Sequence, residues 1–382
     1  MKKLLLFGIL IITLSVSCKR SIKKEPVKKI LINLKDEEKT VKWSDFFSKE
    51  IKFLPLETTK NALIGKITKV KISGQNIYVL DMFIAGKLFQ FDHNGKFIKT
   101  IGTVGDAPGQ YQKPYDFVVD KNQIEILDNG YFLMVYNTDG EFIKRKKLKK
   151  SAFNFEKEAN NYFFINGDRN YYLTLTNQKL EPYKEKFPFI SRTVNAVIPN
   201  GIFKQQDTVL VRRNLIDTIY AIVPENKSNK FKVIPYKYID YGDKSFNVYD
   251  YLNSDNIDHI IQKKQQDYCR TGMYIENTRH SVIYFSYKGD LWMYIKSKNN
   301  GKQKLFKLKN SINDISFNPL TTHIIGKYKD YFIFQIEPSD LLNASDTELK
   351  KSPVYKKIIE VRQKIDEKSN PILMLVKFKD NL

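Results

Sequence analysis

Apolar runs separated by turn residues recur along this chain at a regular distance. The segments at residues 77–81 (IYVLD), 88–92 (LFQFD) and 94–98 (NGKFI) return at 124–128 (IEILD), 134–137 (MVYN) and 139–143 (DGEFI). The offset is 47 residues for the first segment and 45 for the last. Alternating apolar positions predict half-buried strands, and the Asn-Gly and Asp-Gly dipeptides predict tight turns between strands. Each copy therefore predicts a β-hairpin.

The rhythm continues beyond these two copies. A fainter third copy follows at 172–180, and strand pairs around a turn are expected at 209–223, 281–297 and 323–337. A period of roughly 40 to 50 residues is typical of the four-stranded blade of a β-propeller. The 273 residues from Ile64 to Ile336 give roughly 45 per blade if there are six blades, although five or seven would also divide the region tolerably.

Two stretches interrupt the strand pattern. Residues 247–268 and 345–368 are expected to be partly helical insertions, and 372–378 (ILMLVKF) is expected to be a final buried strand after Asn370-Pro371. An open blade edge invites aggregation, so the strands near Ile30 and Ile372 are candidates for pairing to close the ring. The prediction is an all-β fold, a single six-bladed β-propeller domain over residues 30–382.

The first residues, MKKLLLFGILIITLSVSCKR, predict an export signal. The apolar run from Leu4 to Leu14 is shorter than the roughly 20 residues of a membrane-spanning helix. Residues 1–17 are therefore interpreted as a signal peptide and 18–29 as a charged tether. Cys18, after Ser15-Val16-Ser17, resembles the lipobox of bacterial lipoproteins, which implies lipidation of Cys18; an ordinary cleaved signal with an incidental cysteine stays open.

The remaining composition is that of an exported globular protein. Cys269 is the only other cysteine, so a chain lipidated at Cys18 forms no internal disulfide and depends on its core. The net charge of +22 falls to +20 without Lys2 and Lys3. The lysines are scattered among asparagines without an Arg-rich run, which indicates a solvated basic surface and no nucleic-acid partner. Weak attraction to anionic surfaces or polymers is a minor alternative.

The glycine-rich stretch 91–120 raises the question of a phosphate or calcium site. A calcium loop that begins at Asp92 would place Lys96 at position 5 and Thr103 at position 12, where oxygen ligands are needed. The glycines also lack the Gly-x-Gly-x-x-Gly spacing and the following helix of a dinucleotide site. The stretch is interpreted as a hairpin followed by the passage to the next blade, and no cofactor is expected.

Reactive constellations are equally scarce. There is no Gly-x-Ser-x-Gly motif, and Cys269 has no histidine partner visible in the sequence. Asp81 and Asp128 are interpreted as groups that cap turns. Asp116, which NHL-like blades place near the innermost strand, is kept as a candidate channel residue for ligand contact, although hydrogen bonding to local backbone amides is favoured. No catalytic or metal-binding residue is assigned.

Aromatic residues are abundant, at 13% of the chain. Propeller strands use aromatic side chains between blades, so most of them are expected to be structural. A few tyrosines within 236–251 are candidates for contact with a ligand.

A family resemblance covers nearly the whole chain. The run IYVLD…LFQFDHNGKFIKTIG…GDAPGQYQKPYDFVVD at 77–120 resembles an NHL-type repeat, and the chain resembles the six-bladed β-propeller lipoproteins of Bacteroidetes. The resemblance implies a lipid-anchored propeller in the cell envelope, at the outer membrane, that binds or scaffolds a protein, carbohydrate or peptide ligand. The basic Lys19-Arg20 pair slightly favours its periplasmic face. The alternative function is a metal-dependent hydrolase or lyase with its site in the central channel.

Overall fold

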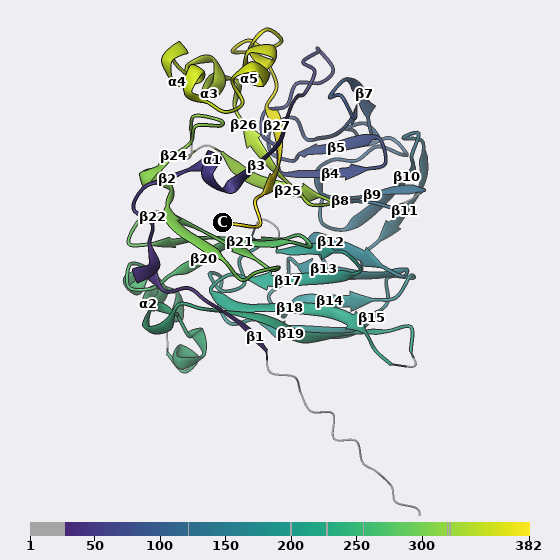
Figure 1. Ribbon diagram of the computed structural model, residues 1–382. Helices are drawn as coiled ribbons and strands as arrows, with labels where there is room; N and C mark the ends of the chain where they lie inside the picture. Colours follow the sequence, from purple (N-terminus) through teal and green to yellow (C-terminus); the bar gives the residue numbers. More distant parts are fainter. Residues whose placement is uncertain are drawn as a thin grey trace, which may run out of the picture.

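The computed structural model describes residues 27–120, 122–198, 201–226, 228–254, 256–318, 320 and 322–382. Cys18 and the predicted signal peptide lie outside the described residues. In the described part, six antiparallel sheets follow one another around a ring, as the colours from purple to yellow show (Figure 1). The predicted six-bladed β-propeller is confirmed.

The blades are formed by consecutive strands. Blade one consists of β4 (Lys69–Ser73), β5 (Asn76–Asp81), β6 (Lys87–Asp92) and β7 (Phe97–Thr100). Blade two consists of β8 (Pro114–Val119), β9 (Gln123–Asp128), β10 (Phe132–Asn137) and β11 (Phe142–Lys147). Blade three consists of β12 (Ala152–Glu158), β13 (Asn161–Asn166), β14 (Tyr171–Thr176) and β15 (Pro182–Pro188).

Blade four consists of β16 (Ile202–Gln205), β17 (Thr208–Arg213), β18 (Ile216–Pro224) and β19 (Phe231–Asp240). Blade five consists of β20 (Arg270–Glu276), β21 (His280–Tyr287), β22 (Asp290–Ser297) and β23 (Gln303–Lys307). Blade six consists of β25 (His323–Tyr328), β26 (Tyr331–Ile336), β27 (Ile372–Phe378) and β3 (Phe47–Pro55).

The predicted hairpin turns are where the sequence places them. Asn94-Gly95 joins β6 to β7, and Asp139-Gly140 joins β10 to β11. Gly95 and Gly140 have φ values of +84° and +79°, in the left-handed region that glycine tolerates. The stretch from Ile101 to Lys113 is the passage from the outer strand of blade one to the inner strand of blade two.

The ring is closed in blade six by strands from both ends of the chain. β27 pairs with β3, with Ile372 opposite Pro55 and Phe378 opposite Phe47. The strand near Ile30 does not take part, so that half of the closure prediction was wrong. Instead β1 (Lys28–Leu31) adds to blade four as a fifth strand parallel to β19. Both segments are apolar, and their local patterns did not distinguish an added edge strand from the closing one.

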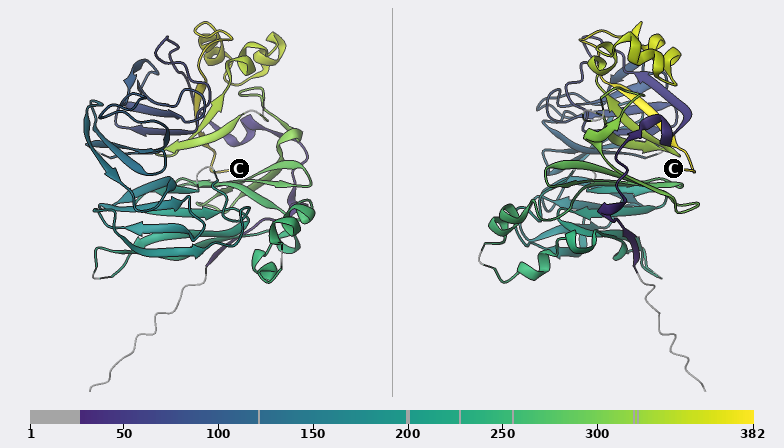
Figure 2. Two further views of the ribbon diagram at one scale, coloured as in Figure 1. Left: turned by 180° about the vertical axis from the view of Figure 1, so that it is seen from behind. Right: turned by 60° about the vertical axis from the view of Figure 1, so that its left-hand side comes forward.

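The N-terminal segment 28–55, here called the strap, runs along the outside of three blades (Figure 2). After β1 it passes η1 (Leu34–Asp36) and reaches blade five, where the Glu38 amide donates to the Leu305 carbonyl at 2.8 Å. β2 (Val41–Lys42) then pairs with β24 (Ser311–Ile312), and α1 (Trp43–Phe46) leads into β3. Trp43 is fully buried and donates from Nε1 to Ser311 at 3.0 Å.

The core consists of apolar layers between neighbouring blades. In β5, Tyr78 and Leu80 face blade two, while Ile77 and Val79 face blade six. Because both faces of a middle strand are covered, these strands read as continuous apolar runs with buried side chains on both sides. Equivalent layers lie at the other blade junctions.

Helical segments decorate one face of this frame. That face, here called the linking face, carries the passages from each outer strand to the next inner strand. The insertion after blade four holds η2 (Gly242–Lys244), η3 (Val248–Tyr251) and α2 (Ile257–Lys264). The insertion inside blade six holds α3 (Pro338–Leu342), α4 (Asp346–Lys351) and α5 (Tyr355–Arg362), and η4 (Leu308–Asn310) precedes β24. The predicted insertions are thus helical in part, while α3 was not expected.

Candidate functional site

Asp116 lies on β8, the inner strand of blade two, as predicted. Its side chain is buried, and Oδ1 accepts from Lys69 Nζ and from the Phe117 amide, each at 2.8 Å. Oδ2 accepts from the Phe155 amide at 2.9 Å. Lys69, Asp116 and Phe155 belong to the inner strands of three consecutive blades. Asp116 therefore ties these strands together, and its contact with a ligand stays a prediction.

Other charges on the inner strands also bind one another. Lys69 Nζ lies 3.6 Å from Glu156, Lys204 forms an ion pair with Glu158, and Lys327 donates to the side-chain oxygen of Gln205. Burial lowers the pKa of Lys327 to about 8. Two of these contacts pair opposite charges on different blades, as expected for buried charges, and the third joins Lys327 to the neutral amide of Gln205.

The remaining candidates for chemistry have structural roles. The Asp81 carboxylate accepts from three backbone amides, those of Gly65, Lys66 and Ile84, at 2.7 to 3.0 Å, and Asp128 accepts from two. Their prediction as turn-capping groups is confirmed. Burial raises the pKa of Cys269 to about 12, so its thiol stays protonated at neutral pH.

The hydrolase alternative would require several histidines and carboxylates around one metal ion. Within the ranges described above, no three His, Cys, Asp or Glu side chains lie close enough together to hold a metal ion. His93 lies in the β6–β7 turn, as predicted, and His280 is buried with Nε2 3.0 Å from the Lys379 carbonyl.

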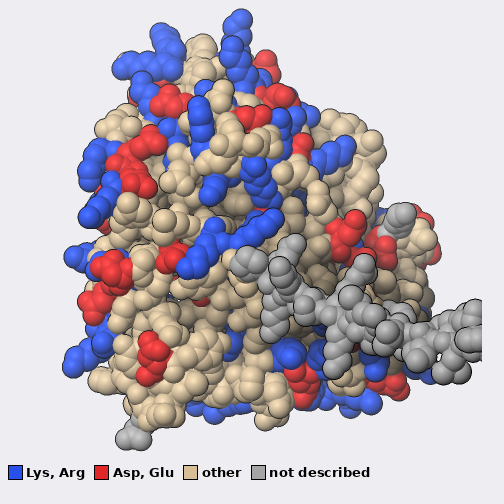
Figure 3. All heavy atoms as spheres, turned by 60° about the horizontal axis from the view of Figure 1, so that its bottom comes forward, with Lys and Arg blue, Asp and Glu red and all other residues tan. Residues whose placement is uncertain are grey.

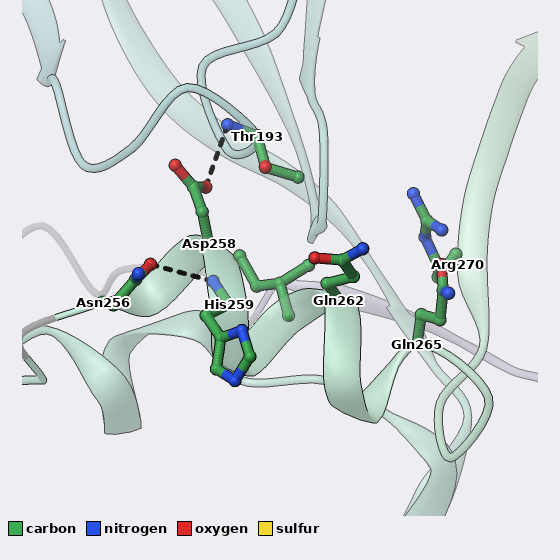
Figure 4. Close-up of a pocket in the computed structure, with 8 residues that line it drawn as sticks. Thr193, Asn256, Asp258, His259, Gln262, Gln265 and Arg270 are labelled. Atoms are coloured by element: carbon green, nitrogen blue, oxygen red, sulfur yellow. Dashed lines mark hydrogen bonds between the residues drawn. The ribbon is translucent and has the colours of Figure 1, made fainter.

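A cavity of about 460 Å³ lies on the linking face, beside α2 (Figure 4). Its walls come from the helix, from the passage between blades three and four, and from the first residue of β20. The lining side chains are almost all polar: Thr193, Asn256, Asp258, His259, Ile261, Gln262, Gln265 and Arg270. The volume is in the range of small-molecule sites. We call this the α2 pocket.

The helix presents these side chains through its own periodicity. Asp258, Ile261, Gln262 and Gln265 are spaced three, one and three residues apart, so they lie along one side of α2. The Asn256 side chain accepts from the His259 amide at 3.0 Å and caps the helix start. The Asn256 cap thus fixes where α2, the helix that forms one wall of the pocket, begins.

Asp258 fixes the opposite wall. Its Oδ1 accepts from the Thr193 amide at 3.1 Å, and the Thr193 carbonyl accepts from the Asn214 side chain at 2.8 Å. Burial favours the neutral acid, but hydrogen bonds from Ser191, Thr193 and the Arg192 amide outweigh it and lower the pKa of Asp258. Asp258 is therefore ionised at neutral pH, with its charge engaged by the loop.

The floor beneath the pocket is rigid and apolar. Ile261 belongs to a buried cluster with Val194, Leu215, Phe246 and Val248. A small hollow of about 10 Å³, lined partly by the Phe246 and Tyr268 rings, adjoins the pocket through Ile261, Gln265 and Arg270. The α2 wall of the pocket therefore packs on this apolar cluster through Ile261.

Arg270 supplies the cationic side of the pocket. It begins β20 opposite Ser286, and the following strand is held by Arg212, whose Nη2 donates to the Gly272 carbonyl at 2.9 Å. In the described part of the chain, its guanidinium has no hydrogen-bond or ion-pair partner. Figure 4 shows the Gln262 side chain extending toward the side of the pocket on which Arg270 lies.

The sequence did not reveal this pocket. Residues 247–268 were predicted to be partly helical, and they contain the helical wall of the pocket, but no function was predicted for them. No role was predicted for Arg270, which follows Cys269. Of the tyrosines proposed for ligand contact within 236–251, Tyr241 is buried and Tyr249 is 48% exposed. The available signal was the polar side of a short helix next to an isolated arginine, a pattern that many solvated helices share.

Comparison with known proteins identifies the family. The model of the DUF4934 family, described as a domain of unknown function, matches residues 29–377, and the chain belongs to this family. A search of curated proteins found no match.

One solved structure shows the same fold. A Bacteroides fragilis protein described as exported has a TM-score of 0.74 at 20% identity, covering 92% of this chain and all of its own. BamB from Moraxella catarrhalis has a TM-score of 0.34 at 10% identity, covering 62% of this chain and 60% of its own. In the described residues, no helix is long and apolar enough to cross a membrane.

Proposed function

We propose that this protein is a binding module of the cell envelope, a propeller that holds a ligand in the α2 pocket. The observation that carries the proposal is the pocket itself: about 460 Å³ lined by polar side chains that are fixed by capping, by Asp258 and by a buried cluster. Preorganised polar groups on a rigid frame favour binding, because little ordering is needed when the ligand arrives. Its ligand would be a carbohydrate, a peptide or part of a protein.

We further propose the location predicted from the N-terminal sequence. Residues 1–17 would be removed as a signal peptide, Cys18 would carry the lipid, and residues 18–29 would tether the propeller of residues 30–382 to the outer membrane. The description of the Bacteroides fragilis neighbour as exported supports export of this chain. The basic Lys19-Arg20 pair favours the periplasmic face.

A tryptophan that fills the pocket tests the binding function. Gln262→Trp places a bulky side chain in the cavity from an exposed position of α2, while Lys263→Trp changes the neighbouring exposed position, which does not line the pocket. Both variants and the unmodified chain, residues 19–382, would be screened on arrays of glycans and peptides. We expect ligands of the unmodified chain to lose at least tenfold in affinity with Gln262→Trp and to be unaffected by Lys263→Trp.

Two results would overturn the proposal. Equal binding by the two tryptophan variants would place the site elsewhere. Conversion of any array ligand to a product in the presence of divalent metals, followed by mass spectrometry, would show an enzyme and return the hydrolase or lyase alternative.

A further inference from the structure

The charge balance of the α2 pocket points to the kind of ligand it takes. Asp258 is engaged by the Thr193 amide, so its charge is already compensated within the protein. Arg270 has no such partner among the described residues. The pocket therefore offers one uncompensated guanidinium, a group that binds a carboxylate through two parallel hydrogen bonds.

The rest of the lining is neutral and hydrogen-bonding. Gln262 and Gln265 supply carboxamides, each with two donors and an acceptor, and Asn256 supplies the two donors of a carboxamide whose oxygen caps α2. Groups that both donate and accept match the hydroxyls of a sugar ring.

We propose that the α2 pocket binds an acidic sugar, a sugar unit that carries one carboxylate, with the carboxylate on Arg270 and the hydroxyls on the carboxamides. This inference rests on the proposed binding function and specifies its ligand. A single guanidinium matches one carboxylate better than a multiply charged phosphate. The nearly complete absence of apolar lining in the described pocket, where Ile261 is the exception, disfavours a hydrophobic peptide side chain.

The overall charge agrees with an acidic ligand. Without Lys2 and Lys3 the sequence carries a formal charge of +20, and basic side chains are spread over the face shown in Figure 3. Such a field raises the local concentration of acidic polymers and speeds their encounter with the protein. The diffuse positive charge would attract acidic polymers in general, whereas Arg270 would select a ligand with a carboxylate.

The test compares two trisaccharides of the same linkage, one of galacturonate and one of galactose, by isothermal titration calorimetry with residues 19–382. We expect the acidic trisaccharide to bind at least tenfold more tightly than the neutral one. Arg270→Gln should reduce that ratio to about one, and Arg270→Lys should keep part of it. Arg169→Gln is the matched control, because Arg169 is an exposed arginine outside the pocket, and it should leave the ratio unchanged.

The outcomes separate this inference from the proposed function. Equal binding of both trisaccharides, or an unchanged ratio in Arg270→Gln, would overturn the acidic-sugar assignment. So would failure of both to bind while another array ligand is lost in Gln262→Trp, a result that would leave the binding module intact. Thermal melting of each variant shows that it is folded, and Arg270→Lys keeps the test valid if Arg270→Gln unfolds.

Discussion

Buried carboxylates in this protein differ in how well their charge is compensated. Asp81 accepts from three backbone amides and Asp128 from two, so the carboxylates of both have hydrogen-bond donors inside the structure. Asp217, on β18, is also buried, and its Oδ1 accepts from the Thr271 hydroxyl at 3.1 Å. Burial raises the pKa of Asp217 to about 7, although the Thr271 hydrogen bond and Arg212 oppose the shift. Asp217 is therefore a carboxylate whose ionisation works against folding.

Asp217→Asn should make the free energy of unfolding depend less on pH between about 4 and 7. The folded pKa of about 7 lies above the unfolded value of about 3.9, so the wild-type chain loses stability as pH rises between these values. We expect the free energy of unfolding of the variant, relative to wild type, to rise by up to about 1.4 kcal/mol per pH unit in this window and to level off above it. Urea denaturation from pH 5 to pH 8 measures the difference. A constant difference would contradict the assigned pKa.

Single residues also show what sequence reasoning can reach. Asp81 and Asp128 were predicted as capping groups because an Asp directly after a strand accepts from nearby amides whatever the rest of the fold does. Arg270 could not be assigned, since its meaning depends on α2 and on Thr193, which lies 77 positions earlier in the chain. Local chemistry is visible in a sequence, whereas a pocket made by three distant segments is not.

At the scale of elements, the strap contributes two strands, β1 and β3, to the propeller. They differ in their importance for closing the ring. β1 adds an outer strand to a blade that already has four, and its Ile30 and Ile32 extend the layer between blades four and five. β3 is the fourth strand of blade six; its first residue, Phe47, and the preceding Trp43 and Phe46 lie in the layer between blades five and six. Closure therefore depends on β3 and not on β1.

Two shortened chains should separate these roles. A chain that begins at Asn33 loses two buried isoleucines, which contribute about 1.5 to 3 kcal/mol each, and should fold with a lower melting temperature. A chain that begins at Glu57 also loses β3 and three buried aromatic residues, at about 3 to 5 kcal/mol for each ring, which is comparable to the total stability of a typical domain. We expect it to be insoluble. Circular dichroism and soluble yield measure both, and a folded chain without β3 would disprove the assignment.

The hairpins were predictable because each is encoded within a few residues, by alternation and by Asn-Gly or Asp-Gly turns. The closing partner was not, because pairing between β27 and β3 joins segments more than 300 residues apart and either apolar N-terminal segment satisfies the same local pattern. Which N-terminal strand pairs with β27 is decided by the closure of the whole ring and not by the local sequence.

At the scale of the whole molecule, a basic surface offers a second way to remain on a membrane. Figure 3 shows lysine and arginine side chains distributed over the face seen, with acidic groups between them. Attraction between exposed charges is screened at high ionic strength, whereas a covalently attached lipid chain is not. Retention on membranes must therefore be measured after a wash in about 1 M salt, where the screening length is about 3 Å.

Cys18→Ala should release the protein from salt-washed membranes and abolish its labelling by a radioactive fatty acid, because the lipid would be attached to this thiol. Cys269→Ala is the matched control, since Cys269 is the only other cysteine and is buried in the fold. It should keep both the label and the membrane fraction. Membrane retention of Cys18→Ala after the wash would contradict the lipid anchor. A wild-type protein that is soluble and unlabelled would instead indicate an ordinary cleaved signal, leaving the propeller and its pocket free outside the cytoplasm.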